Sequence, residues 1–384
     1  MDFLKMKLRF DAGERMQKVK HRIRKNEVIS DYYKQLAEET GVERYKRNAM
    51  RIYWCCSSWV INFYEQQKIN DLISTSRCRD RFCENCQNAL AVQRSKKYEP
   101  VLRVLAKCFD IYHVVFTIPN PSPVELPRAV NRMYEQIGYV IRILRGNAKV
   151  KGIDFKQYGF EGAIRSLEIT KGKDGVTFHP HFHCLFVFRK GVKFEGFHVN
   201  SYSFDNADVK KSHHKKDPKN PQKRYFTDFE VLLQKVWRLR YDGVKVTKES
   251  INALQEGYSV VANKAKPKDY KEVFKYATKG VLKAKDKTGG YVDFETLLET
   301  LEDRRIVQGY GCFRCLNKEL YAGQEDEEEL SEAIYQDFVN FLRSKETPFF
   351  GGKKLEDIVK DVKKGDITYI TKKTFDLETC YDTR

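Results

Sequence analysis

At residues 178–188 the chain runs Phe178-His179-Pro180-His181-Phe182-His183-Cys184-Leu185-Phe186-Val187-Phe188, an apolar segment with histidine at every second position from 179 to 183. Side chains of a strand alternate between its two faces. The three imidazoles are therefore expected on one face, and the cysteine and the later phenylalanines on the other. This pattern predicts a strand that carries a metal site on one face.

The residues before this strand predict its partner. Residues 163–170 also have the composition of a strand, and the segment 171–175 between the two is rich in turn-forming residues. We expect a hairpin with Asp174-Gly175 as a two-residue turn. Counting back from this turn places Glu168 opposite His181.

Two neutral imidazoles and a carboxylate leave positions open on a divalent cation, which suits Lewis-acid catalysis on a phosphate or on water. We take His181, His183 and Glu168 as ligands of a catalytic Mg²⁺ or Mn²⁺, and leave open whether His179 is a further ligand. Two alternatives stay open from these residues alone. The histidines could instead hydrogen-bond to neighbours in a structural hairpin, or the set could be the two-histidine, one-carboxylate site of an iron oxygenase.

The composition is that of a folded protein with an anionic partner. The 384 residues are 41% hydrophobic and carry a formal net charge of +18. Such an excess is expected of a protein that binds a phosphate backbone, although an acidic membrane surface would attract it too. We expect a cytoplasmic location without membrane insertion, because no apolar run approaches the roughly 20 residues that span a bilayer and the N-terminus lacks a signal-peptide pattern.

Ten cysteines in such a chain are expected to be thiols or metal ligands rather than disulfides. The spacing Cys-x4-Cys-x2-Cys at residues 78–86, with Cys55-Cys56 upstream, can supply four thiolates to a structural zinc ion. The expected ligands are Cys56, Cys78, Cys83 and Cys86. Spacing alone does not decide between Cys55 and Cys56, and reduced buried cysteines are the alternative. Cys312-x2-Cys315 would either complete this site or hold a second metal.

Periodicity outlines the rest of the core. Residues 111–118 predict a buried strand, and residues 130–144 keep helical spacing up to a stop at Gly146. Thr227-Asp228-Phe229-Glu230 has the pattern of a capping box that opens another helix. We expect an α+β fold with a mainly antiparallel sheet packed on helices. Its regions are a basic helical and zinc-binding region (1–108), the core (109–290) and a helical C-terminal region (291–384).

A basic segment follows the hairpin. Residues 207–226 contain many lysines and two prolines, a composition that predicts a surface loop able to contact DNA phosphates. The candidate DNA-binding residues in this loop are Lys210, Lys211, Lys215, Lys216 and Arg224.

A second candidate for chemistry is residues 270–280, which we expect to form one helix that stops near Gly280. On a helix Glu272 and Tyr276 are i, i+4 neighbours, and Tyr276 and Lys279 are i, i+3 neighbours, so a carboxylate, a phenol and an ammonium share one face. A cation beside the phenol favours the phenolate, which is a nucleophile. An ordinary charged helix with one surface tyrosine is the alternative.

In order and content these segments resemble the rolling-circle replication initiators of small bacterial plasmids, within the HUH endonuclease superfamily. Phe116-Thr117-Ile118 resembles the first motif of that family, His181-Phe182-His183 its two-histidine metal motif, and Lys275-Tyr276-x-x-Lys279 its tyrosine motif. The cysteine cluster also resembles this subgroup, whereas Cys312-x2-Cys315 and the long basic loop depart from it. A single tyrosine downstream of the histidines favours an initiator over a relaxase or a transposase of the superfamily.

The resemblance implies an HUH endonuclease core that nicks one strand at a replication origin. Tyr276 would attack the scissile phosphate to form a 5′-phosphotyrosine link and a free 3′-hydroxyl primer, with the phosphate polarised by the bound metal. Glu272 would act as general base at termination, and Lys275 and Lys279 would steady the phosphate or the phenolate.

The expected partners are single- and double-stranded origin DNA in a bacterial cytoplasm, with a host helicase and a DNA polymerase as candidate protein partners. A zinc-stabilised DNA-binding regulator without catalytic activity is the main alternative from another class of protein.

Overall fold

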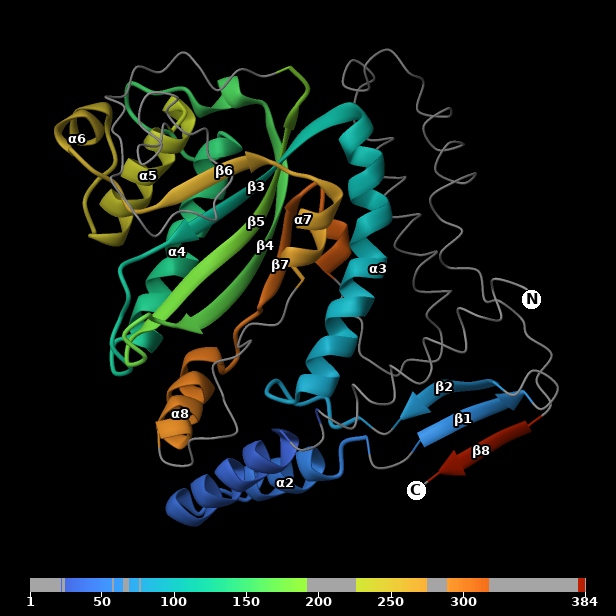
Figure 1. The fold of residues 1–384 in the computed structure, drawn as a ribbon. Coiled ribbons are helices and arrows are strands. Elements are labelled where there is room, and N and C mark those ends of the chain that lie inside the picture. Colours follow the sequence, from blue (N-terminus) through green and yellow to red (C-terminus); the bar gives the residue numbers. More distant parts are fainter. Residues whose placement is uncertain are drawn as a thin grey trace.

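The computed structural model describes residues 22, 25–56, 59–64, 69–75, 77–191, 226–274, 289–317 and 379–383. Its centre is a five-stranded antiparallel sheet (Figure 1). In spatial order the strands are β6 (Val260–Lys264), β3 (Phe109–Thr117), β5 (Phe178–Arg189), β4 (Phe160–Lys171) and β7 (Val307–Gly311). The prediction of an α+β fold with a mainly antiparallel sheet is confirmed.

The β4–β5 hairpin has the predicted register but a wider loop. Glu168 lies opposite His181, as expected. The prediction of a two-residue turn at Asp174-Gly175 is wrong, because the loop closes earlier, where the Gly172 N–H donates to the Thr177 carbonyl at 2.7 Å. Lengthening a loop equally on both sides leaves the register of its strands unchanged, so Glu168 keeps its predicted partner.

One face of the sheet is covered by α4 (Leu126–Leu144) and α5 (Asp228–Tyr241) (Figure 1). The apolar stripe of α4, including Val130 and Met133, is buried in the same core as Phe182 of β5. The capping box of α5 is confirmed. The Thr227 hydroxyl accepts from the Glu230 N–H, and the Glu230 carboxylate accepts from the Thr227 N–H.

The other face is covered by α3 (Glu84–Cys108) and the short α7 (Pro267–Glu272) (Figure 1). Residues of α3 and α7 form a second core with Ile164 of β4 and Leu185 of β5. The expectation of one helix over 270–280 is corrected: α7 begins at Pro267 and ends at Glu272, and the next two residues, Val273 and Phe274, form a turn buried in this second core. Residues 275–288 lie outside the described part of the chain.

The described part of the chain has further elements outside this sheet. They are a helical stretch at 25–40, α2 (Glu43–Tyr53), α6 (Lys248–Ala253), α8 (Gly289–Leu301), two 3₁₀ turns (Phe155–Tyr158 and Arg314–Asn317) and a separate antiparallel sheet of β2 (Ile69–Thr75), β1 (Trp59–Tyr64) and β8 (Thr379–Thr383). β7 follows residue 290, so the central sheet also draws on the region that the sequence assigned to the C-terminal part. Within the described ranges, no helix is long and apolar enough to cross a bilayer.

Candidate metal centres

A carboxylate and two imidazoles converge on the sheet face that α3 and α7 partly cover. Glu168 comes from β4, and His181 and His183 come from β5, where alternation places both rings on the same side. The Glu168 Oε2 lies 3.2 Å from Nε2 of His181 and 2.8 Å from Nε2 of His183. The three side chains are sheltered without being fully closed off from solvent, and His181 is 9% exposed. The three ligand residues predicted from the sequence are thus brought together.

The far nitrogen of each ring has a partner, which sets how the ring faces the carboxylate. His181 Nδ1 lies 3.1 Å from the His179 carbonyl, and because a carbonyl can only accept, Nδ1 carries the hydrogen. His183 Nδ1 lies 3.1 Å from Nε2 of His113. In a neutral His181 with the hydrogen on Nδ1, the Nε2 lone pair points at a carboxylate oxygen, and a cation held between these two acceptors would stabilise the arrangement.

The pKa of Glu168 reflects its burial and its two histidine neighbours. Burial acts to raise the pKa of Glu168, but hydrogen bonds and charge from His181 and His183 outweigh it, so that the net pKa is lowered. The carboxylate is therefore ionised. A carboxylate oxygen and two imidazole nitrogens, all within 4.8 Å of one another, fit a divalent cation with open coordination positions.

His179 shares the face but not the site. Its Nδ1 lies 2.7 Å from Oδ1 of Asn120, and its ring is not among the side chains that meet at Glu168. Burial, with a smaller contribution from the charge of His181, lowers the pKa of His179 to about 4. His179 is a neutral neighbour of the centre in this structure.

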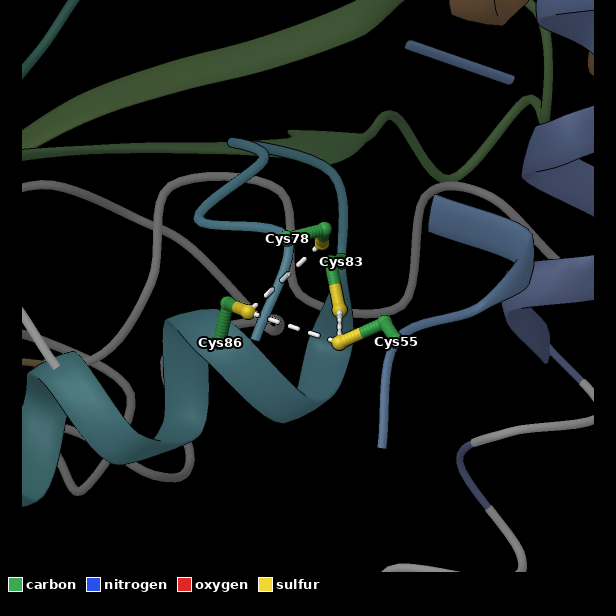
Figure 2. A group of neighbouring side chains, drawn as sticks. All are labelled: Cys55, Cys78, Cys83 and Cys86. Atoms are coloured by element: carbon green, nitrogen blue, oxygen red, sulfur yellow. Dashed lines mark hydrogen bonds between the residues drawn. The ribbon is translucent and has the colours of Figure 1, made fainter. Parts of the chain in front are cut away.

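The second centre is a group of four buried cysteine sulfurs (Figure 2). The Sγ of Cys55 lies 3.4 Å from that of Cys83 and 3.6 Å from that of Cys86, and the sulfurs of Cys78 and Cys86 are 3.6 Å apart. Zinc–sulfur bonds of about 2.3 Å in a tetrahedron separate the sulfurs by about 3.8 Å. The group is therefore of the size that a zinc-type ion requires.

The four cysteines come from segments at the end of one helix and the beginning of another. Cys83 is the N-cap of α3 and Cys86 lies in its first turn, while Cys78 comes from the loop before it and Cys55 from the turn that follows α2 (Figure 2). Backbone N–H groups of the loop donate to sulfur, from Arg79 to Cys86 at 3.2 Å and from Asp80 to Cys78 at 3.4 Å. Such hydrogen bonds stabilise thiolates.

The pKa of one of the four thiols is also lowered by its neighbours. Hydrogen bonds with Cys55, Cys78 and Cys83 lower the pKa of Cys86, which favours its thiolate form.

The choice of Cys56 as the fourth ligand is corrected. Cys56 adopts a positive φ of 64° after α2, and its sulfur lies 3.8 Å from that of Cys55, outside the group of four. Cys55 takes the position instead. Cys312 is buried in the core under α3 and α7 and joins neither centre among the described residues.

Some predicted residues cannot be placed in either centre. Glu272 is the last residue of α7, on the sheet face that carries Glu168. The residues Lys275, Tyr276, Lys279, Lys210, Lys211, Lys215, Lys216 and Arg224 lie outside the described part of the chain.

One residue that contacts the centre was not predicted from the sequence. His113 of β3 meets His183, and its position could have been found by alternation, because Ile111, His113, Val115 and Thr117 share one face of that strand. Comparison of the chain with protein-family models, curated proteins and solved structures finds no match.

Proposed function

We propose that the chain is a rolling-circle replication initiator that nicks single-stranded origin DNA by attack of Tyr276 on a phosphodiester. The observation that carries the proposal is the approach of Glu168 Oε2 to Nε2 of His181 and of His183 at 3.2 and 2.8 Å. This donor set leaves a cation open to an oxygen ligand from a substrate. Combined with a net charge of +18, it favours a phosphate substrate.

Glu168, His181 and His183 would hold Mg²⁺ or Mn²⁺, which are cations that accept carboxylate ligands and exchange readily. When bound, such a cation supplies Lewis-acid polarisation of a non-bridging phosphate oxygen. The residues themselves fix where that oxygen is held, because both rings are oriented through their Nδ1 atoms and have little freedom to turn.

The nucleophile of the proposal is the Tyr276 oxygen. As the phenolate, having lost its proton to solvent, it would bond to phosphorus while the bond from phosphorus to the 3′-oxygen breaks; the leaving oxygen takes a proton from solvent, so that the 5′-phosphate stays on the protein and a 3′-hydroxyl is released as primer. Lys275 and Lys279 would favour the phenolate and balance charge on the phosphate. At the end of a round Glu272 would take the proton from the water or 3′-hydroxyl that attacks the phosphotyrosine.

Position along the chain supports Tyr276 in this role. Phe274 is buried in the core on the face of the sheet that carries the Glu168 centre, and its ring stacks on Tyr98 of α3 with centroids 5.0 Å apart. Tyr276 follows two residues later in the sequence. Phe274, the last described residue before Tyr276, therefore lies against this face of the sheet.

The cysteine group would hold a structural Zn²⁺ that ties α2 to the start of α3, since four thiolates select zinc over Mg²⁺ and Mn²⁺. The basic residues of 207–226 would bind the DNA backbone in a bacterial cytoplasm, and a host helicase and polymerase would follow on the nicked strand.

The deciding experiment is a nicking assay on labelled single-stranded DNA from the origin of the native plasmid, with Mg²⁺, with Mn²⁺ and with chelator. We expect cleavage and a covalent protein–DNA adduct only with metal, loss of both in His183→Ala, and retention of both in His179→Gln, whose ring is not in the centre. Binding without cleavage under every metal condition would refute the nuclease and favour a zinc-stabilised DNA-binding regulator.

A further inference from the structure

His113 is a residue near the catalytic centre that the proposed mechanism does not use. It lies on β3, opposite Leu185 of β5, with its ring on the face of the sheet that carries Glu168. The nearest ligand to it is His183, whose strand position is opposite Val115. The contact between His113 and His183 is therefore diagonal across two neighbouring strands.

The two rings are nearly parallel and in contact. Nε2 of His113 and Nδ1 of His183 are 3.1 Å apart, the ring centroids are 5.2 Å apart, and the ring planes differ by 14°. An offset, nearly parallel pair with one nitrogen of each ring at 3.1 Å fits an N–H···N hydrogen bond between His183 and His113.

We propose that His113 is a positioning residue that accepts the Nδ1–H of His183 and thereby holds the His183 Nε2 lone pair toward Glu168. The ring of His181 is oriented in a similar way, because it donates its Nδ1–H to the His179 carbonyl. Both ligands therefore present Nε2 to Glu168. A histidine ligand whose far nitrogen donates to an acceptor is fixed in tautomer and orientation. At His183 the partner of Nδ1 is a side chain from β3 instead of a backbone carbonyl.

The proposal has a consequence for His113 itself. To accept at Nε2 while neutral, His113 must carry its own hydrogen on Nδ1. A side chain that offers an acceptor at the position of Nε2 should replace it, whereas one that offers an acceptor nearer the backbone should not. Glutamine places its carbonyl oxygen at about the distance of Nε2, asparagine at about that of Nδ1, and leucine has no acceptor.

The inference rests on the proposed cation at Glu168, His181 and His183, so the test measures binding of the cation without DNA. Full-length protein with its cysteine centre zinc-loaded is titrated with Mn²⁺ and free Mn²⁺ is followed by electron paramagnetic resonance. We expect His113→Leu and His113→Asn to weaken Mn²⁺ binding by about 10–100-fold, the range for residues that support a ligand, and His113→Gln to stay within a few-fold of the native protein.

A second readout reports the tautomer directly. Long-range ¹H–¹⁵N spectra should show His183 protonated at Nδ1 in the native protein and in His113→Gln, and mixed tautomers in His113→Asn. If the leucine variant fails to fold, the glutamine and asparagine pair carries the test. Equal Mn²⁺ affinity in all variants would overturn the role of His113, whereas no Mn²⁺ binding to the native protein would overturn the cation site on which it rests.

Discussion

Glu168 lies directly opposite His181 in the β4–β5 ladder, and its Oε2 reaches Nε2 of that ring at 3.2 Å and Nε2 of His183 at 2.8 Å. The contact results from strand pairing and alternation, which together place one carboxylate between two imidazoles. It makes Glu168 the residue on which the centre depends most, because both rings point at the same oxygen.

Glu168→Gln should therefore abolish Mn²⁺ binding while the protein stays folded. The amide keeps the size of the side chain and can donate to the ring nitrogens, but it removes the charge that attracts the cation. We expect the loss of affinity to exceed the about 10–100-fold typical of a residue that only supports a ligand. The Mn²⁺ titration checks this, with melting temperature as the measure of folding.

Glu161→Gln is the matched control, because this carboxylate is on the same strand and pairs with Arg189 at 3.0 Å, away from the histidines. Normal Mn²⁺ affinity in Glu168→Gln would exclude Glu168 as a ligand.

Cys55→Ser should lose zinc, and Cys56→Ser should keep it. The two cysteines are adjacent in sequence, but only the Cys55 sulfur belongs to the group of four. Because a structural zinc site contributes to folding directly, the Cys55 variant should also melt at a lower temperature. Elemental analysis of purified protein decides it, with about one zinc per chain expected in the native protein. Loss of zinc from the Cys56 variant alone would reverse the assignment.

The hairpin could be predicted from the sequence because its information is local. Alternation in residues 178–188 fixes which side chains share a face, and the register survived an error in the turn because the loop is lengthened equally on both sides. The zinc-type group was predicted from spacing for three of its four members. The fourth ligand could not be chosen from spacing, because Cys55 and Cys56 are adjacent. Cys56 has a positive φ after α2, and no residue pattern in the sequence predicts this conformation.

The predictions that failed concern elements whose structure depends on contacts between distant segments of the chain. The helix expected over 270–280 ends at Glu272, where Val273 and Phe274 are buried against α3 and the central sheet. Tertiary packing here overrides helical propensity. β7 contains two glycines and few apolar residues, and becomes a strand only by pairing with β4. A side chain at Gly311 would meet the backbone of Glu161. Gly311 therefore weakens the strand pattern in the sequence but allows β7 to pair closely with β4.

Binding to duplex DNA should weaken steeply as salt is raised. Each protein–phosphate contact releases condensed cations, so the logarithm of the affinity falls with the logarithm of salt by about 0.9 per contact. Replacing Lys210 and Lys211 together with Ala should reduce that slope by about 2 and leave the dependence on DNA sequence unchanged. Fluorescence anisotropy over a salt series measures it. A slope near zero in the native protein would contradict the assignment of the +18 charge to phosphate contacts.

Tyr276→Phe and Glu272→Gln should fail at different steps. The phenylalanine variant keeps the ring but lacks the nucleophilic oxygen, so both nicking and the covalent adduct should disappear. The glutamine variant keeps the size of Glu272, the last residue of α7, but lacks a base, so nicking should persist while adducts and over-length single strands accumulate. Denaturing gels of labelled origin DNA separate free 3′ ends, adducts and long products. α7 ends at Glu272, and the gels test whether Glu272 and Tyr276 act at separate steps. If Glu272→Gln lost the first nick as completely as Tyr276→Phe, Glu272 would belong to the nicking step, and the base for termination would have to be another residue.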